Sequence, residues 1–158
     1  IKMNFADKLV ATYEGRIMKD GDIVILYEGH DSLDYLTLKN GSILNNKFGA
    51  FYHRYFIGKP YGSKIIASYG KSFLYALQCT PELWSVALKT RTQIVDDIDG
   101  SVVAMALDLY PGCVVAESGT GSGCMTLAMA RCIAPTGHIH TYEYNPNRAE
   151  AAKGEFKQ

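Results

Sequence analysis

Short apolar runs separated by turn residues fill the first half of the chain, a pattern typical of β-strands. Ile23–Tyr27 is one such run, and residues 35–38 form a second that ends at Asn40-Gly41. Asparagine and glycine both tolerate positive φ, so this dipeptide predicts a hairpin turn. Two more runs follow at 64–67 and 73–77. Several short strands at close spacing predict a small barrel or sandwich.

The pattern changes near Thr80, where helical signals begin. Thr80 can cap a helix, Pro81 suits its first turn, and Glu82 lies near the positive end of the helix dipole. We therefore predict a small β-barrel-like domain over residues 1–79 and a second domain over 80–158.

Strands and helices alternate in this second domain. Cys113–Ala116 is a continuous apolar run typical of a buried parallel strand. A helix is predicted over 125–133, a strand over 138–143, and a helix from Asn145-Pro146. This order predicts an α/β fold, the start of a doubly wound sheet. Two parallel strands cannot form a complete buried sheet, so we expect the chain to be the first part of a longer protein.

Composition excludes several classes of protein. The 158 residues are 47% hydrophobic and 20% charged, which is too apolar for a disordered chain. No apolar run approaches the roughly 20 residues that span a bilayer, so no membrane association is predicted. The spacing of the cysteines and histidines matches no metal site, and the cysteines are predicted to be buried free thiols.

The charges are unevenly distributed although their sum is zero. No acidic residue lies between Asp34 and Glu82, whereas six cations do, interleaved with nine aromatic residues from Phe48 to Tyr75. Interleaved cations and rings are what an RNA-contacting surface uses for phosphates and unstacked bases. The alternative is that the rings form the strand core and the lysines keep it soluble. The residues are Lys39, Lys47, Arg54, Lys59, Lys64 and Lys71, with Phe48, Phe51, Tyr52, Tyr55, Phe56, Tyr61, Tyr69, Phe73 and Tyr75.

A glycine-rich segment carries the candidate chemistry. It follows a predicted strand, precedes a predicted helix, and reads Glu117-Ser118-Gly119-Thr120-Gly121-Ser122-Gly123. Glycines let the backbone turn tightly and approach a ligand. Glu143 lies 20 residues beyond Gly123, at the predicted end of the next strand. A carboxylate at that place can accept hydrogen bonds from both hydroxyls of a ribose.

Glu117 discriminates between two nucleotide cofactors. A pyrophosphate needs the positive end of a helix, and a carboxylate beside it is unfavourable. S-adenosylmethionine carries an amino group and a cationic sulfur but no phosphate, and its ammonium matches Glu117. The sequence therefore favours S-adenosylmethionine over NAD, while a purely structural glycine loop remains an alternative.

Several segments in order resemble the catalytic subunit family of the eukaryotic tRNA (adenine-N1)-methyltransferase that modifies position 58. The resemblance extends from about Gly21 to Phe156. The segments are 58–64, 80–84, 91–94, 109–112, 115–123, 134–138 and 148–150.

The resemblance implies a function and a set of site residues. The reaction would be S-adenosylmethionine-dependent methylation of adenosine N1 in the tRNA T loop, on a class I (Rossmann-like) methyltransferase domain. Residues implied to contact the cofactor are Gln93, Glu117, Ser118, Gly119, Thr120, Gly121, Ser122, Gly123, Glu143 and Arg148. The family's catalytic aspartate would lie beyond Gln158, so no catalytic residue is assigned. Asp96 stands where the family usually has a tyrosine or similar residue, which leaves the lining of the pocket there open.

The resemblance also implies partners and a location. The family works as a heterotetramer of two catalytic and two non-catalytic paralogous subunits on tRNA, in the nucleus; the chain itself has no visible targeting segment. Three alternatives remain. They are a class I methyltransferase with another substrate, such as protein isoaspartate, a NAD-binding Rossmann enzyme, and a non-enzymatic RNA-binding module in the first 79 residues.

Overall fold

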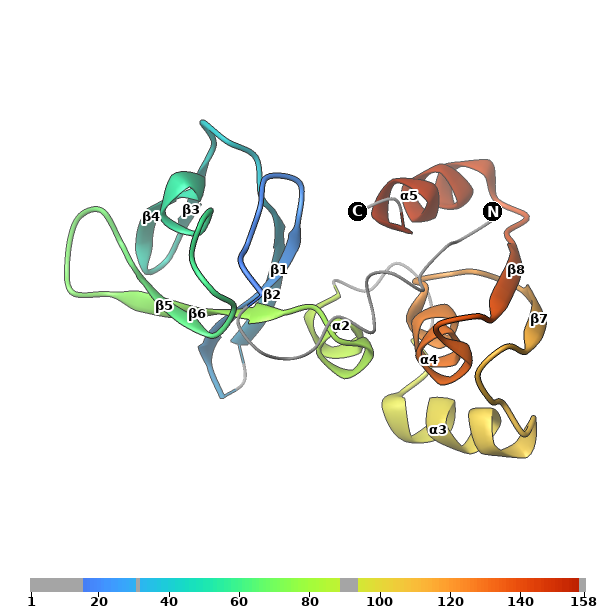
Figure 1. The fold of residues 1–158 in the computed structure, drawn as a ribbon. Coiled ribbons are helices and arrows are strands. Elements are labelled where there is room, and N and C mark those ends of the chain that lie inside the picture. The colour runs from blue at the N-terminus through green and yellow to red at the C-terminus, as the bar shows by residue number, and fades with distance from the viewer. Residues whose placement is uncertain (1–15, 31, 89–93, 157–158) are drawn as a thin grey trace. The chain divides into compact units, whose positions relative to one another are not determined.

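A computed structural model describes residues 16–30, 32–88 and 94–156 (Figure 1). Its contacts divide these residues into two compact units, with the change between Ala87 and Leu88. The first unit contains the β-strands of the first half and the short helix α2 (Pro81–Ala87). The second contains the parallel strands and three helices.

The β unit is built on an antiparallel sheet with the strand order β2-β1-β6-β5. These strands are β1 (Ile23–Gly29), β2 (Ser32–Thr37), β5 (Ser63–Ile66) and β6 (Phe73–Gln78). A separate hairpin joins β3 (Ile43–Asn46) to β4 (Gly49–Tyr52), and a 3-10 turn, η1 (His53–Tyr55), follows it. Asn40-Gly41 does form a turn, with Gly41 at φ 82°, but it leads from β2 into the other sheet instead of closing a hairpin.

One face of the sheet forms the core of the β unit. Val24, Leu26, Ile65 and Leu74 are at most 1% exposed and belong to one apolar cluster, as the alternation of a strand requires. The barrel-like arrangement expected from the strand spacing is not supported. In the described residues β2 and β5 lie at opposite edges and do not pair, and short strands at regular spacing suit open and closed sheets alike.

Helix α2 packs against strands β1 and β2 of the four-stranded sheet. The Trp84 ring meets the Tyr35 ring edge-on, with centroids 4.9 Å apart. The domain ranges expected from the sequence, 1–79 and 80–158, stay a prediction; by its contacts α2 lies with the strands.

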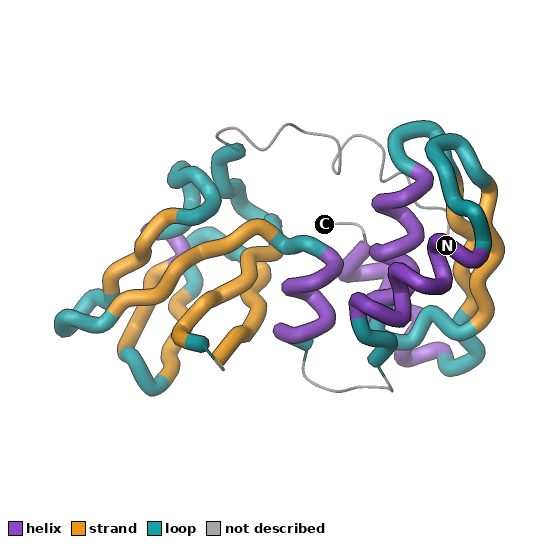
Figure 2. The backbone as a smooth tube through the Cα atoms, turned by 90° about the horizontal axis from the view of Figure 1, so that it is seen from below, coloured by secondary structure: helices purple, strands orange, loops and turns teal. Residues whose placement is uncertain are grey.

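The second unit has the expected strand–helix–strand–helix order and is α/β. It contains α3 (Asp97–Ala106), β7 (Val114–Ser118), α4 (Cys124–Ile133), β8 (His138–Tyr142) and α5 (Pro146–Phe156). β7 and β8 are parallel, with Val114 opposite His138 and Ser118 opposite Tyr142. Helix α4 packs against β8 and α3 against α4. The helices of this unit, purple in Figure 2, lie beside its two strands, which are orange.

Alternation along the parallel strands sets the core of this unit. Val115 and Ile139 face α4 and are buried against Met129 and Ile133. The residues that alternate with Val115 along β7 and with Ile139 along β8 face away from α4, and Val114 is 72% exposed. All four cysteines are free thiols, but only Cys124 is buried, and the other three are partly exposed. None of the helices in the described residues is long and apolar enough to cross a bilayer.

Candidate functional site

The loop from β7 to α4 turns at glycines with positive φ. Gly121 lies at +54°, and Gly123, directly before α4, lies at +76°. A Cβ on Gly123 would lie 2.7 Å from the Phe156 ring of α5. The backbone conformation therefore favours glycine at this position, and any larger residue would also displace the Phe156 ring.

Glu143 ties the loop to the end of β8. Its Oε2 accepts a hydrogen bond from the Gly121 N–H at 3.0 Å, and its Oε1 accepts one from the Asn145 N–H at 3.0 Å. The Arg148 Nη2 lies 3.2 Å from Oε1. The side chain of Glu143 is only 5% exposed, so the structure holds its carboxylate in one orientation.

These contacts favour the charged form of Glu143. Hydrogen bonds from the amides of Asn145 and Gly121, and the positive charge of Arg148, hold the pKa of this carboxyl below its ordinary value of 4.5. The unfolded chain therefore binds this proton more readily than the folded one. The contribution to stability is complete above the ordinary pKa and is lost as the pH falls through the lowered native value.

This linkage predicts that the difference in stability between the parental chain and Glu143→Gln depends on pH. The urea midpoint of the variant should lie below that of the parental chain at about pH 7, and the gap should narrow toward about pH 3. Urea titrations of both proteins across that range measure it. A gap that stays constant with pH would show that the charge of Glu143 does not stabilise the fold.

Glu117 is held from inside the unit by threonine hydroxyls. Thr126 of α4 and Thr141 of β8 each donate to its Oε2 at 2.6 Å. The hydroxyls of Thr120 and Thr141 are also 2.6 Å apart. Because the single hydroxyl hydrogen of Thr141 goes to the carboxylate, Thr120 must be the donor to Thr141. The three threonines are at most 4% exposed, so this buried network fixes Glu117 and the loop together.

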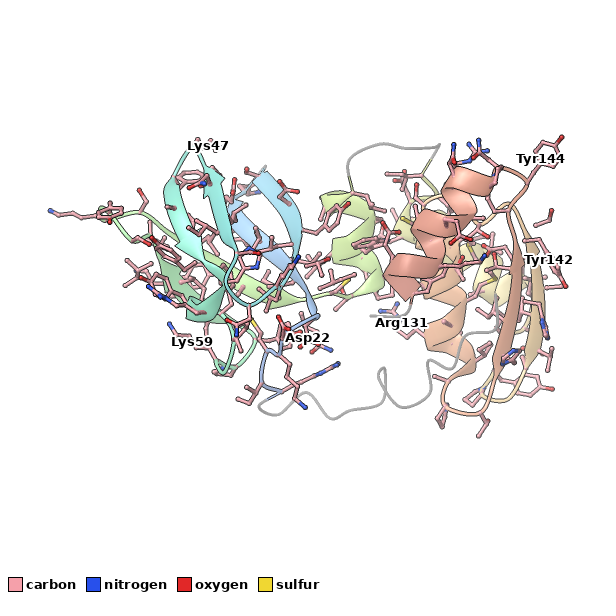
Figure 3. All side chains as sticks on the ribbon, turned by 90° about the horizontal axis from the view of Figure 1, so that it is seen from above. Asp22, Lys47, Lys59, Arg131, Tyr142 and Tyr144 are labelled. Atoms are coloured by element: carbon pink, nitrogen blue, oxygen red, sulfur yellow. The ribbon has the colours of Figure 1, made fainter. Side chains whose placement is uncertain are left out.

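A cavity of about 640 Å³ opens between the loop and the end of β8. Its lining residues are Ser118, Gly119, Gly121, Tyr142, Glu143, Tyr144 and Arg148. The side chains of Tyr142 and Tyr144 lie at the outer edge of the unit, and Tyr144 is fully exposed (Figure 3). The cavity therefore combines a fixed carboxylate, an exposed backbone turn and aromatic rings.

The structure brings together some of the residues expected at the site and separates others. Ser118, Gly119, Gly121, Glu143 and Arg148 line one cavity. Glu117 does not line that cavity, since its Oε2 faces the buried threonines.

The other described residues expected at the site do not line this cavity either, and Gly123 lies at the N-cap of α4. Thr120 and Ser122 are buried, at 4% and 5% exposed. Gln93 lies outside the described residues. Asp96 lies at the N-cap position of α3, in an extended conformation.

Sequence reasoning missed Thr126, Thr141, Tyr142 and Tyr144. Strand alternation was a usable signal for two of them. Ile139 and Thr141 share the inner face of β8, and Tyr142 therefore faces outward.

The hydrogen bonds of the loop N–H groups indicate which cofactor fits this site. Gly119 and Thr120 donate to the Tyr142 carbonyl, Gly121 to Glu143, and Gly123 to the Thr120 carbonyl. These amides are occupied by protein acceptors, which is unfavourable for a pyrophosphate cradle. A ribose needs acceptors instead, and Glu143 has lone pairs beyond the bonds it receives from the protein. The residues fit the nucleoside of S-adenosylmethionine better than the pyrophosphate of NAD.

The chain is similar in sequence to subunits of tRNA methyltransferases. A family described as "tRNA methyltransferase complex GCD14 subunit" matches residues 72–158. The chain is 42% identical, over 90% of its length, to a tRNA (adenine(58)-N(1))-methyltransferase catalytic subunit from Dictyostelium discoideum. It is 43% identical, over 89% of its length, to the protein of the same description from Kluyveromyces lactis. The chain spans 46% and 35% of these two relatives, so it corresponds to less than half of each.

Two solved structures share the fold over most of the chain. A SAM-dependent O-methyltransferase from Thermotoga maritima matches with a TM-score of 0.74 at 29% identity, covering 89% of this chain and 52% of the other. A tRNA (m1A58) methyltransferase from Aquifex aeolicus matches with a TM-score of 0.64 at 25% identity, covering 90% and 54%.

Proposed function

We propose that this chain, which belongs to the family of tRNA methyltransferase complex GCD14 subunits, is the cofactor-binding part of a tRNA (adenine-N1)-methyltransferase catalytic subunit. Its reaction is the transfer of a methyl group from S-adenosylmethionine to N1 of the adenosine at position 58 of the T loop. The observation that carries the proposal is the tie between the glycine loop and Glu143 at the edge of a 640 Å³ cavity. It occurs in a chain about 40% identical to catalytic subunits of that description.

Each residue of the site then has a role in holding the cofactor. S-adenosylmethionine supplies an electrophilic methyl group on a positively charged sulfur. Glu143 accepts hydrogen bonds from the ribose hydroxyls, and Arg148 keeps the Glu143 carboxylate in place. The loop beside Glu143 is formed by Glu117, Ser118, Gly119, Thr120, Gly121, Ser122 and Gly123.

Glu117 contributes in this proposal mainly through its negative charge. The carboxylate at the end of β7 favours a ligand that carries an ammonium group and no phosphate. Gln93 completes the proposed set of cofactor contacts, and no residue of this chain is assigned to proton removal.

The substrate is inferred from sequence identity, because the fold is shared by methyltransferases that act on different substrates. An O-methyltransferase and a tRNA methyltransferase share this fold, so the fold alone does not choose between them. Identity of 42–43% over nine-tenths of the chain to adenosine-58 enzymes favours tRNA. By the same relationship we propose a complex of two catalytic and two non-catalytic paralogous subunits, located in the nucleus.

Methyl transfer to tRNA tests the proposal directly. The full-length protein, purified with its natural partners, is incubated with labelled S-adenosylmethionine and tRNA. The matched control is the same tRNA with the adenosine at position 58 replaced. Label that enters the first tRNA and not the second is the expected result. Equal labelling of both tRNAs, or none in either, would refute the assigned substrate.

A further inference from the structure

Among the residues that the structure describes, one face of the four-stranded sheet of the β unit is covered only in part. Its inner face packs into the core, whereas the outer face carries α2 at one end, where Trp84 meets Tyr35. Ile25, opposite Tyr35, is fully buried and is not part of the inner cluster. The other end of the outer face lies beyond these residues, toward Tyr27 and the β5–β6 hairpin, which projects from the sheet (Figure 1).

Aromatic residues cross this open end in a row. Tyr27 of β1 is opposite Tyr75 of β6, and Tyr75 is opposite Lys64 of β5. Phe73, two residues before Tyr75, meets it edge-on with ring centroids 5.7 Å apart. Phe73 and Tyr75 are 41% and 38% exposed, whereas Phe51 and Phe56 are fully buried in the core. The aromatic residues of this half therefore divide into a core set and a set on the open face.

A cavity of about 550 Å³ lies against this row. Tyr27, Phe73 and Tyr75 line it from the sheet, together with Phe48 and Lys71. The Lys64 Nζ lies 3.6 Å from the centre of the Phe73 ring, and the Lys47 Nζ lies 5.0 Å from that of Phe48. Lys47, at the β3–β4 turn, is labelled in Figure 3. Lys71 thus lines the aromatic cavity, and Lys47 and Lys64 lie over rings that line it. All three belong to a segment that has no acidic residue from 35 to 81.

Glu28 gives the cavity one fixed acceptor. Its Oε1 accepts a hydrogen bond from the Asn46 Nδ2 at 2.5 Å, and its Oε2 accepts one from the Ser32 hydroxyl at 3.0 Å. A carboxylate held in place beside aromatic rings repels phosphate and accepts from N–H groups. A ligand with N–H donors on a flat ring, and phosphates that reach the surrounding lysines, matches this arrangement.

We propose that this cavity binds an unpaired nucleotide of an RNA strand. The base stacks on Tyr75 beside Phe73, whose ring carries the Lys64 ammonium. It presents its edge to Glu28, while the flanking phosphates contact Lys47, Lys64 and Lys71. Exposed rings on a sheet flanked by cations bind single strands because every base has a stacking face and every nucleotide carries a charge. The inference rests on the proposed function, since it supplies a contact for the tRNA outside the cofactor site.

Binding of a short RNA by the full chain and its variants tests the proposal. The probe is a fluorescent unstructured oligouridine of about ten nucleotides, a length within the site sizes of such surfaces. Replacing Phe73 and Tyr75 together by leucine keeps apolar side chains but removes both rings. The expected result is an affinity at least about tenfold lower with an unchanged dependence on salt. The matched control is Tyr69→Leu, which changes an aromatic residue that is 83% exposed and does not line the cavity.

The lysines give a second, independent readout. Replacing Lys64 and Lys71 by glutamine should reduce the slope of log affinity against log salt by about 0.7 for each phosphate that the variant no longer neutralises. The two sets of variants thus separate stacking from charge. A leucine double variant that binds oligouridine as tightly as the parental chain and Tyr69→Leu would overturn the proposal. Equal affinity of the parental chain for a duplex of the same length would overturn the requirement for an unpaired nucleotide.

The cofactor site provides the control that separates this inference from the proposed function. The affinity for S-adenosylmethionine is measured calorimetrically on the same leucine and glutamine variants. It is expected to equal that of the parental chain, because none of the replaced residues lines the cavity beside the glycine loop. Failure of the parental chain to bind S-adenosylmethionine would refute the proposed function. Unchanged RNA affinity in the variants would refute the nucleotide pocket alone.

Discussion

Glu143→Gln is expected to weaken binding of S-adenosylmethionine by about 100-fold. The carboxylate accepts from Gly121 through one oxygen and from Asn145 and Arg148 through the other. Glutamine has a single acceptor oxygen, so one of the two backbone amides must face an NH₂ group. The variant therefore loses acceptors for the ribose hydroxyls and the loop anchor together. Isothermal titration of the full chain with S-adenosylmethionine measures the loss.

A pair of nucleosides separates the ribose contact from the loop anchor. Adenosine carries the two hydroxyls that Glu143 is proposed to bind, and dideoxyadenosine lacks both. The parental chain should prefer adenosine, and Glu143→Gln should bind the two nucleosides almost equally. Glu150→Gln, at a side chain that is 72% exposed, is the matched control for removal of a negative charge from this unit. A parental chain with no preference between the two nucleosides would contradict the assigned role of Glu143.

The position of Glu143 was predictable from the sequence because its causes are local. An apolar strand, a glycine turn and a helix return the chain to a second parallel strand, and the next residue then lies at the same edge of the sheet as the loop. The register of Ser118 opposite Tyr142 places Glu143 directly beyond that edge. The α/β architecture of the second half follows from the same reasoning and is confirmed.

The strand order of the β unit could not be predicted in this way. β1 pairs with β6, so Tyr27 lies opposite Tyr75, 48 residues further along the chain. Periodicity identifies strands and their faces but not their neighbours, and this limit explains the unsupported barrel. Asn40-Gly41 shows the same limit, because the turn forms while the strands on its two sides pair elsewhere.

The inward contacts of Glu117 could not be predicted from the sequence, because they join side chains of β7, β8 and α4. Strand alternation directs Thr141 inward, but its contact with Glu117 also requires the parallel register that sets the two residues opposite each other. Thr126 adds a donor from α4. A carboxylate expected to face the ligand is thus also the acceptor of a buried network, which links the loop to the core of the unit.

Thr141→Val tests this network by removing its central hydroxyl at nearly constant volume. The Thr120 hydroxyl then has no acceptor at Thr141, and the Glu117 carboxylate loses one of its two threonine donors. A buried unsatisfied donor and a lost bond to a charged group together cost about 2–3 kcal/mol. We expect the urea midpoint to fall by about 1 M, since small domains have slopes of about 1–3 kcal/mol per molar urea. Affinity for S-adenosylmethionine should fall as well, because the same network positions the glycine loop.

Rescue by Thr141→Ser distinguishes the hydrogen bonds from packing. Serine keeps the hydroxyl and removes one methyl group, a loss of about 1 kcal/mol, so it should recover most of the midpoint and the affinity. Thr136→Val, at an exposed position in the turn before β8, should change stability by less than about 0.5 kcal/mol. If valine proves as stable as threonine at 141, the network does not support the loop. If serine is as damaging as valine, the methyl contacts of Thr141 matter more than its hydroxyl, and the position of Glu117 must then be set by Thr126 alone.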